Sequence, residues 1–109
     1  MSTDLTELRP SAVIGGLAAL AQTTRLALLR RLVRRGSRGE SAGDLARQLR
    51  IPPQTLSFHL KEMTRAGLLQ PRREGRRVYY AVDFEHVRRL GAYLSDCCCA
   101  DDAEALGEG

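Results

Sequence analysis

Long apolar runs, scattered cysteines and catalytic motifs are all missing from this chain of 109 residues. No segment is apolar over the roughly 20 residues that a membrane-spanning helix requires, and the N-terminus lacks the charged segment and apolar core of a signal peptide. We therefore expect a cytoplasmic protein with no membrane partner. The chain also shows no nucleophile paired with a base and no phosphate-binding glycine loop, so we do not expect an enzyme.

Cysteine occurs only as one run of three, and histidine occurs only twice. Adjacent cysteines in a reducing compartment are expected to be thiols, available to soft metals or to redox chemistry, rather than parts of a disulfide framework. The two histidines, His59 and His86, are too few for a zinc site of nitrogen and oxygen ligands, even one shared across a dimer. We expect His86 to be a solvent-facing helix residue.

Arginine, by contrast, is abundant and supplies sixteen of the 17 basic residues. All 17 precede Cys97, whereas four of the 13 acidic residues follow Cys99, so residues 1–99 carry seventeen positive and nine negative charges, a net charge of +8. A chain of this length forms one small domain, and a basic body with an acidic tail fits nucleic-acid binding. An ordinary solvated basic surface is the alternative.

The stretch from Leu49 to Val82 begins with the pattern of a compact helix. Pro53 suits the first turn of that helix, and Gly67 suits the left-handed position just past its end. Between them an apolar residue recurs at i, i+4 and i+7, which predicts one buried stripe made of Leu56, Leu60 and Met63. Hydrogen-bonding residues, as reading of a DNA groove requires, remain mostly on other faces: Gln54, Thr55, Ser57, His59, Lys61 and Arg65.

After Gly67 the period changes to two, in residues 68–73 and 76–82, with only Glu74 and Gly75 between them. This pattern indicates a β-hairpin. Four guanidinium groups, suited to bidentate phosphate contacts, crowd its tip: Arg72, Arg73, Arg76 and Arg77. A helix of polar readers followed by a four-arginine hairpin predicts binding to duplex DNA.

A short helix is expected just before this stretch. Ser41 with Asp44 three residues later resembles a capping box, and it opens a helix whose Leu45, Ala46 and Leu49 face the core. Residues 50–52 then form a turn. A short helix, a tight turn and a polar-faced second helix make a helix-turn-helix, and the hairpin makes it a winged one.

Three more helices are expected around this unit. Ser11 can cap a first helix that is apolar over much of its circumference, and a break at residues 22–24 starts a second helix. In that second helix, leucines and a valine are expected inward and arginines outward: Leu26, Leu29, Leu32 and Val33 against Arg30, Arg31, Arg34 and Arg35. Asp83 caps a last helix. A small domain gains stability by burying further apolar surface in a dimer, so we expect an interface that includes Val13, Leu17, Val87, Leu90 and Leu94.

Three segments in this order, LAALAQTTRLALLRRL, LSFHLKEMTRAGLL and REGRRVYYAV, resemble the ArsR/SmtB family of repressors. The resemblance covers roughly residues 17–99. It implies a mainly α-helical winged helix-turn-helix with a β-hairpin wing, dimeric through its first and last helices and bound to double-stranded operator DNA. The chain then divides into a flexible arm (1–10), the DNA-binding and dimerisation domain (11–96), and a cysteine run with an acidic mobile tail (97–109).

The segment GAYLSDCCC resembles the arsenic-responsive branch whose sensing thiols lie at the end of the last helix. Cys97 and Cys98 match the paired cysteines of that branch, and Cys99 directly after them departs from its spacing. Trivalent arsenic or antimony binds up to three thiolates, so three sulfurs fit the count. The resemblance implies that this effector, bound by Cys97, Cys98 and Cys99, releases the repressor. Because helical positions point about 100° apart, the thiols can converge only if the helix unwinds at or before Cys97.

Other sensing sites of the family are incomplete here. The segment SAGDLARQL lacks the Cys-x-Cys of another arsenic-sensing branch, and Phe84 and His86 stand where zinc-sensing members place an acid and a histidine. Two further functions stay open: a thiol-redox or persulfide-responsive repressor, and a thiol metal carrier without DNA binding. The chain has no cysteine outside the run to form a long-range redox switch, which argues against the thiol-redox repressor. The arginine-tipped hairpin argues against the metal carrier. Three inert thiols at a frayed helix end are the remaining alternative.

Overall fold

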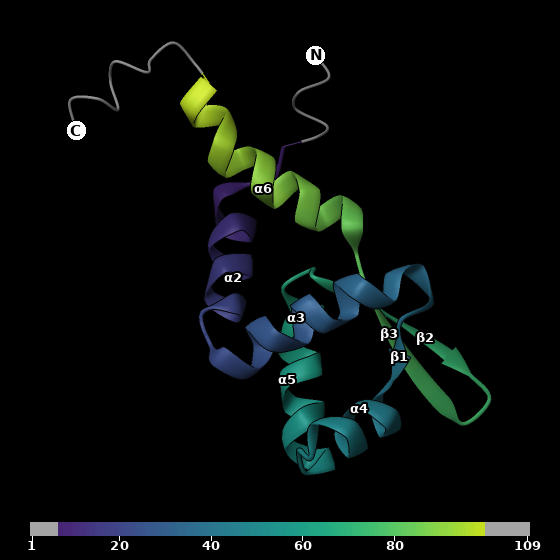
Figure 1. The fold of residues 1–109 in the computed structure, drawn as a ribbon. Helices are drawn as coiled ribbons and strands as arrows, with labels where there is room; N and C mark the ends of the chain where they lie inside the picture. Colours follow the sequence, from purple (N-terminus) through teal and green to yellow (C-terminus); the bar gives the residue numbers. More distant parts are fainter. Residues whose placement is uncertain (1–6, 100–109) are drawn as a thin grey trace.

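The structure is a computed structural model that describes residues 7–99, and of residues 96–99 the backbone alone. It confirms the winged helix-turn-helix, with helices around a three-stranded antiparallel sheet of order β1-β3-β2. The elements in chain order are α2 (Pro10–Leu20), α3 (Thr23–Arg35), the 3-10 turn η1 (Gly36–Arg38), β1 (Glu40–Ser41), α4 (Ala42–Leu49), α5 (Pro53–Arg65), β2 (Leu69–Glu74), β3 (Arg77–Val82) and α6 (Phe84–Cys99). Figure 1 shows α6 at the opposite end of the molecule from α4 and from the tip of the β2–β3 hairpin, here called the wing.

Side-chain caps fix three of the helix starts. The Gln22 side chain accepts a hydrogen bond from the Arg25 backbone N–H at 2.8 Å, and Ser41 Oγ accepts from the Asp44 N–H at 3.1 Å. Asp83 Oδ1 accepts from the His86 N–H at 3.0 Å. These hydrogen bonds confirm the break before α3 and the caps at Ser41 and Asp83. In each case a polar side chain satisfies one of the first free N–H groups of the helix.

The first helix begins differently from the prediction. Pro10 occupies the first turn of α2 and Arg9 the cap position, so Ser11 lies inside the helix. Proline needs no hydrogen-bond partner there because it has no N–H. Leu8, which the prediction places in the N-terminal arm, packs partly buried against the hydrophobic core. Residues 1–6 lie outside the described residues.

The core confirms the stripe predicted for α5. Leu56, Leu60 and Met63 are at most 1% exposed, and they join Leu28, Leu32, Leu45 and Leu68 as the most deeply buried side chains. The inward face of α3 is rotated from the prediction, because Leu28, Leu29 and Leu32 are buried whereas Leu26 and Val33 are 47% and 43% exposed.

Strand β1 was not predicted from the sequence. Its two residues pair with β3, Glu40 opposite Tyr80 and Ser41 opposite Tyr79. The wing itself follows the prediction with a one-residue shift: Glu74 pairs with Arg77, so Gly75 and Arg76 form the two-residue loop. Strand β1 thus joins the wing to the start of α4 and fixes the wing against the helix-turn-helix.

No helix in the described part of the chain has, by itself, the length and apolar character of a membrane span. Among the described residues, only α2 and the segment Thr23–Arg38 taken together have the length and composition of a span. These two helices are bent by 100° relative to each other.

Candidate nucleic-acid interface

Helix α5 presents one exposed face opposite its buried stripe. Because helical residues point about 100° apart, four side chains lie within roughly 60° of one another on that face. They are Gln54, Phe58, Lys61 and Arg65, and all four are exposed. Thr55 and Ser57, on its two flanks, are exposed as well. Five of the six predicted DNA-contacting residues of α5 are therefore accessible to a ligand outside the chain.

His59 is the exception, and the prediction that it faces DNA is wrong. Its side chain is buried, with the residue 9% exposed, because its helical position belongs with Leu56 and Met63. Arg25 Nη1 lies 3.0 Å from His59 Nδ1, and Arg25 Nε donates a hydrogen bond to the Ala19 carbonyl oxygen at 2.6 Å. Burial lowers the pKa of His59, and the Arg25 charge lowers that pKa further. A neutral imidazole that accepts at Nδ1 therefore links α5 to the end of α2.

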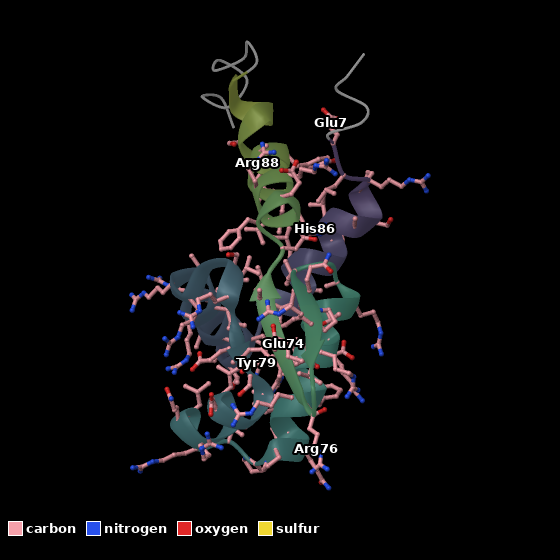
Figure 2. All side chains as sticks on the ribbon, turned by 90° about the vertical axis from the view of Figure 1, so that its right-hand side faces the viewer. Glu7, Glu74, Arg76, Tyr79, His86 and Arg88 are labelled. Carbon is pink, nitrogen blue, oxygen red and sulfur yellow. The ribbon has the colours of Figure 1, made fainter. Side chains whose placement is uncertain are left out.

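The four wing arginines differ in what they contact. Arg73 and Arg76 are exposed, and their side chains have no hydrogen bond or ion pair among the residues that the structure describes. Arg77 is exposed, and its Nη1 lies 4.0 Å from Oδ2 of Asp44 in α4. Figure 2 shows Arg76 at the tip of the wing, far from Arg88 on α6.

Arg72 has a different role, because it is already engaged within the chain. Its Nε donates to Glu74 at 2.7 Å, its Nη2 donates to the Arg38 carbonyl oxygen at 3.1 Å, and its guanidinium carbon lies 5.1 Å from the centre of the Tyr79 ring. The hydrogen bond to Arg38 ties the wing to η1. Arg72 therefore positions the wing, and Arg73, Arg76 and Arg77 supply its accessible charge.

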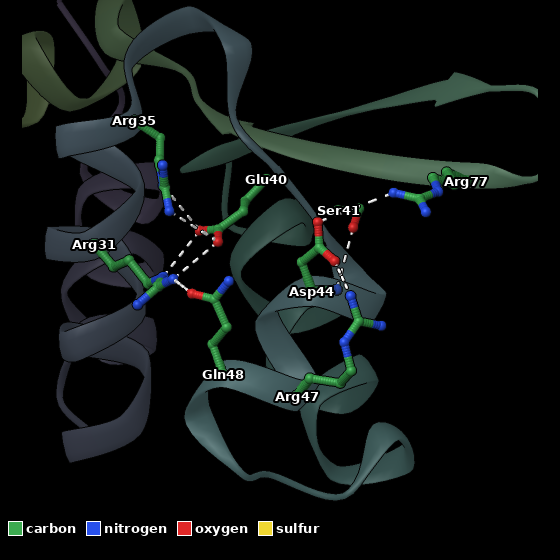
Figure 3. A network of polar contacts seen from close by, with 8 residues as sticks. All are labelled: Arg31, Arg35, Glu40, Ser41, Asp44, Arg47, Gln48 and Arg77. Atoms are coloured by element: carbon green, nitrogen blue, oxygen red, sulfur yellow. Dashed lines mark hydrogen bonds and ion pairs between the residues drawn. The ribbon is translucent and has the colours of Figure 1, made fainter.

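A buried carboxylate in β1 links this strand to α3, and the sequence pattern did not predict it (Figure 3). Glu40 accepts two hydrogen bonds from Arg31, both at 2.9 Å, and two from Arg35, both at 3.3 Å. Its side chain is only 7% exposed. The hydrogen bonds from Arg31 and the charges of both arginines hold the pKa of Glu40 below its usual range, although burial opposes this. Arg31 also donates to Gln48 of α4, so this cluster ties α3, β1 and α4 together.

The predicted dimer residues fall into two groups. Val13 and Leu90 are 4% and 5% exposed, so they belong to the core of the single chain and the prediction for them is wrong. A Cβ added at Gly16 would lie 3.2 Å from Leu90 Cδ2, which shows how closely α2 and α6 pack. Val87 packs partly buried against the core, whereas Leu17 and Leu94 are 41% and 49% exposed.

His86 does not face solvent, contrary to prediction. Its ring covers Gly67, where an added Cβ would lie 2.6 Å from His86 Cε1. Its Nε2 is buried and has no hydrogen-bond partner among the described residues. Gly67 has a φ of +87°, the left-handed conformation expected just past the end of α5. His86 thus places the start of α6 directly on the junction between α5 and the wing.

The side chains of Cys97, Cys98 and Cys99 lie outside the described residues. The backbone of all three continues α6, which ends at Cys99. Among the side chains that are described, no three from His, Cys, Asp and Glu come together as metal ligands.

Comparison with known proteins identifies the family. Residues 20–72 match the family described as Helix-turn-helix domain. The HTH-type transcriptional regulator YgaV of Escherichia coli K12 is 33% identical over 99 residues, which are 89% of this chain and 98% of YgaV. The homodimeric winged helix-turn-helix domain of Mb0332 from Mycobacterium bovis, a possible ArsR-family regulator, is 29% identical with a TM-score of 0.65, over 91% of this chain and 85% of that one. The chain belongs to the ArsR/SmtB family.

A further solved structure that this chain resembles is that of an antimony-specific repressor. The antimony-specific transcriptional repressor AntR is 32% identical, with a TM-score of 0.59, over 85% of this chain and 80% of AntR. Members of the ArsR/SmtB family are DNA-binding transcriptional regulators and not enzymes. This chain is therefore a transcriptional regulator of that family.

Proposed function

We propose that this protein is a repressor that binds palindromic operator DNA as a homodimer and leaves it when trivalent arsenic or antimony binds the cysteine run. The observation that carries the proposal is the exposure of two polar features. The polar face of α5 and the arginines Arg73, Arg76 and Arg77 are exposed, and the tip of the wing lies at the end of the molecule away from α6 (Figure 1).

Each side chain has a distinct task in this proposal. Residues of α5 reach the base edges, whose donors and acceptors in the major groove identify each base pair. They are Gln54, Thr55, Ser57, Lys61 and Arg65. Arg73, Arg76 and Arg77 contact phosphates, which adds affinity without sequence information and makes binding dependent on salt.

The wing assignment is tested by the salt dependence of DNA binding. Arg76→Ala should weaken binding to every duplex and reduce the slope of log affinity against log salt by roughly one unit, because one phosphate contact is lost. Arg88→Ala is the matched control, since Arg88 is 68% exposed but lies on α6 at the far end of the molecule. Equal slopes for Arg76→Ala and the wild-type protein would contradict the docking.

Two features support a homodimer through α2 and α6. Mb0332 is homodimeric, and this chain leaves apolar side chains exposed on the same two helices: Ile14 and Leu17 on α2 and Leu94 on α6. A symmetric pair of copies presents two wings and two α5 helices, one set for each half-site of a palindromic operator.

The sensing proposal rests on the position and chemistry of Cys97, Cys98 and Cys99. Soft trivalent arsenic and antimony select thiolate ligands, and the antimony-specific AntR is a relative. Each bond from arsenic to sulfur replaces one to hydroxide, which leaves with the thiol proton as water. Because the backbone of all three is helical, gathering their sulfurs around one ion requires this end of α6 to change shape. Helix α6 contacts both α2 and the α5–wing junction, so such a change reaches the DNA-binding parts.

Release is tested by titrating operator-bound protein with arsenite, anaerobically and with a phosphine reductant. The wild-type protein should lose affinity by about 5- to 150-fold, the range of a typical allosteric coupling. Cys97→Ser and Cys98→Ser should bind DNA normally and resist release. If the triple serine variant still left the operator, the cysteine run would not be the sensor. Release by peroxide or polysulfide, but not by arsenite, would favour the thiol-redox repressor instead.

A further inference from the structure

Phe58 is a large apolar side chain in the middle of the polar face of α5. It is 56% exposed, and no other large apolar residue of α5 is exposed. One helical turn separates it from Gln54 on one side and from Lys61 and Glu62 on the other. Packing within the chain does not explain a phenylalanine here, because α5 packs on the core through its opposite face, which carries Leu56, Leu60 and Met63.

The Phe58 ring packs against the ring of its neighbour His59. It contacts the His59 ring edge to face, with the ring centres 5.7 Å apart and the planes at 62°. His59 in turn is fixed by Arg25, which is anchored on the Ala19 carbonyl oxygen. A ring held in this way loses little conformational freedom on binding, which favours a precise contact over a loose one.

We propose that Phe58 determines sequence specificity by packing against the 5-methyl group of a thymine in the major groove of the operator. This inference rests on the proposed function, because it requires α5 to lie in that groove. Thymine is the base that presents an apolar group there, and the other base edges offer hydrogen-bond donors and acceptors. Phe58 supplies the apolar reader among neighbours that supply only polar ones.

The test uses the duplex that wild-type protein selects most strongly from a randomised library. Each thymine is then replaced by deoxyuridine, which differs only by the absent methyl group. At one thymine in each half-site, this replacement should weaken wild-type binding about fourfold, the loss expected for one apolar carbon no longer buried. Phe58→Ala should bind the thymine and deoxyuridine duplexes equally, and Phe58→Leu should keep part of the difference.

Phe84→Ala is the matched control, because Phe84 is a similarly exposed phenylalanine, 44%, on α6. It should retain the full thymine preference. The inference is overturned if no thymine replacement weakens wild-type binding, or if Phe58→Ala responds to each replacement as the wild-type protein does. Selection of no duplex by the wild-type protein, or an unchanged salt slope for Arg76→Ala, would instead overturn the proposed function.

Discussion

Some charged side chains of this protein are buried at positions where the sequence pattern predicts only a helix or a loop. Glu40 is the clearest case, since it lies almost fully buried between two arginines of α3. A charged group at this depth is tolerated because it accepts four hydrogen bonds from those arginines. Its burial could not be predicted, because it depends on the pairing of β1 with a strand forty residues away.

Glu40→Gln should destabilise the fold by about 2 kcal/mol, because hydrogen bonds to charged groups contribute about 1.5–3 kcal/mol. Urea unfolding measures the change. Glu74→Gln, which removes an exposed carboxylate paired with Arg72, should change stability by less than about 0.5 kcal/mol. Since the pKa of Glu40 is lowered on folding, the stabilisation is present above its ordinary pKa of 4.5 and is lost as the pH falls through its folded-state pKa. Equal losses for the two variants at pH 7 would contradict this account.

His59 makes stability depend on pH in the range around neutrality. Its pKa is below 6.5 in the folded chain, so the unfolded chain binds more protons as the pH falls below 6.5. Stability should therefore fall between pH 6.5 and the folded-state pKa of His59. Unfolding of wild-type protein and His59→Gln, measured at pH 7.5 and 5.5, isolates this effect. A larger loss in the variant than in the wild-type protein would reverse the assigned sign.

The same helical periodicity that predicted the buried stripe of α5 also placed His59 and Phe58, but residue type misled the assignment. His59 lies about 100° from Phe58, toward the core side. A search for hydrogen-bonding residues selected the histidine and passed over the phenylalanine. Angular position, taken before chemistry, would have placed His59 toward the core and Phe58 on the exposed face.

At the scale of elements, caps and turns were predictable because they depend on residues close in sequence. Ser41, Asp83, Pro53 and Gly67 all act within four residues of themselves. The residues on the inward face of α3, the strand β1 and the engagement of Arg72 were not predictable, since each depends on a partner more than 30 residues away or on the packed core.

The junction of α5, the wing and α6 gives a prediction at this scale. Gly67→Ala should destabilise the fold by about 2–4 kcal/mol, because alanine is strained at positive φ and its Cβ would meet the His86 ring. Gly75→Ala is the control: its φ is +65° but nothing lies within 4 Å of an added Cβ, so only about 1 kcal/mol should be lost. Adding His86→Ala to Gly67→Ala should recover the difference. Without such recovery in urea unfolding, the His86 ring would not be the obstacle.

For the whole molecule, α6 lies at the end opposite α4 and the tip of the wing (Figure 1), and α2 and α6 both carry exposed apolar residues. In the proposed function, two copies join through α2 and α6 and bind DNA through α5 and the wing. Sequence reasoning identified the two helices but not which of their residues remain exposed, because α2 and α6 already pack on each other within one chain.

The position of each leucine on α6 therefore decides how a charge there should act. Leu94 is 49% exposed, so Leu94→Asp should leave the fold intact and place an unpaired charge in the dimer interface. The dissociation constant of the dimer should rise by a factor on the order of 100 or more, as measured by sedimentation equilibrium. Val33→Asp, on the 43% exposed Val33 of α3, should remain dimeric. Leu90→Asp should instead unfold the chain, because Leu90 is 5% exposed in its core. If the Leu94→Asp protein were folded and still dimeric, the interface would lie elsewhere. A folded monomer that binds a half-site weakly and has lost affinity for the palindrome would show that operator recognition requires the dimer.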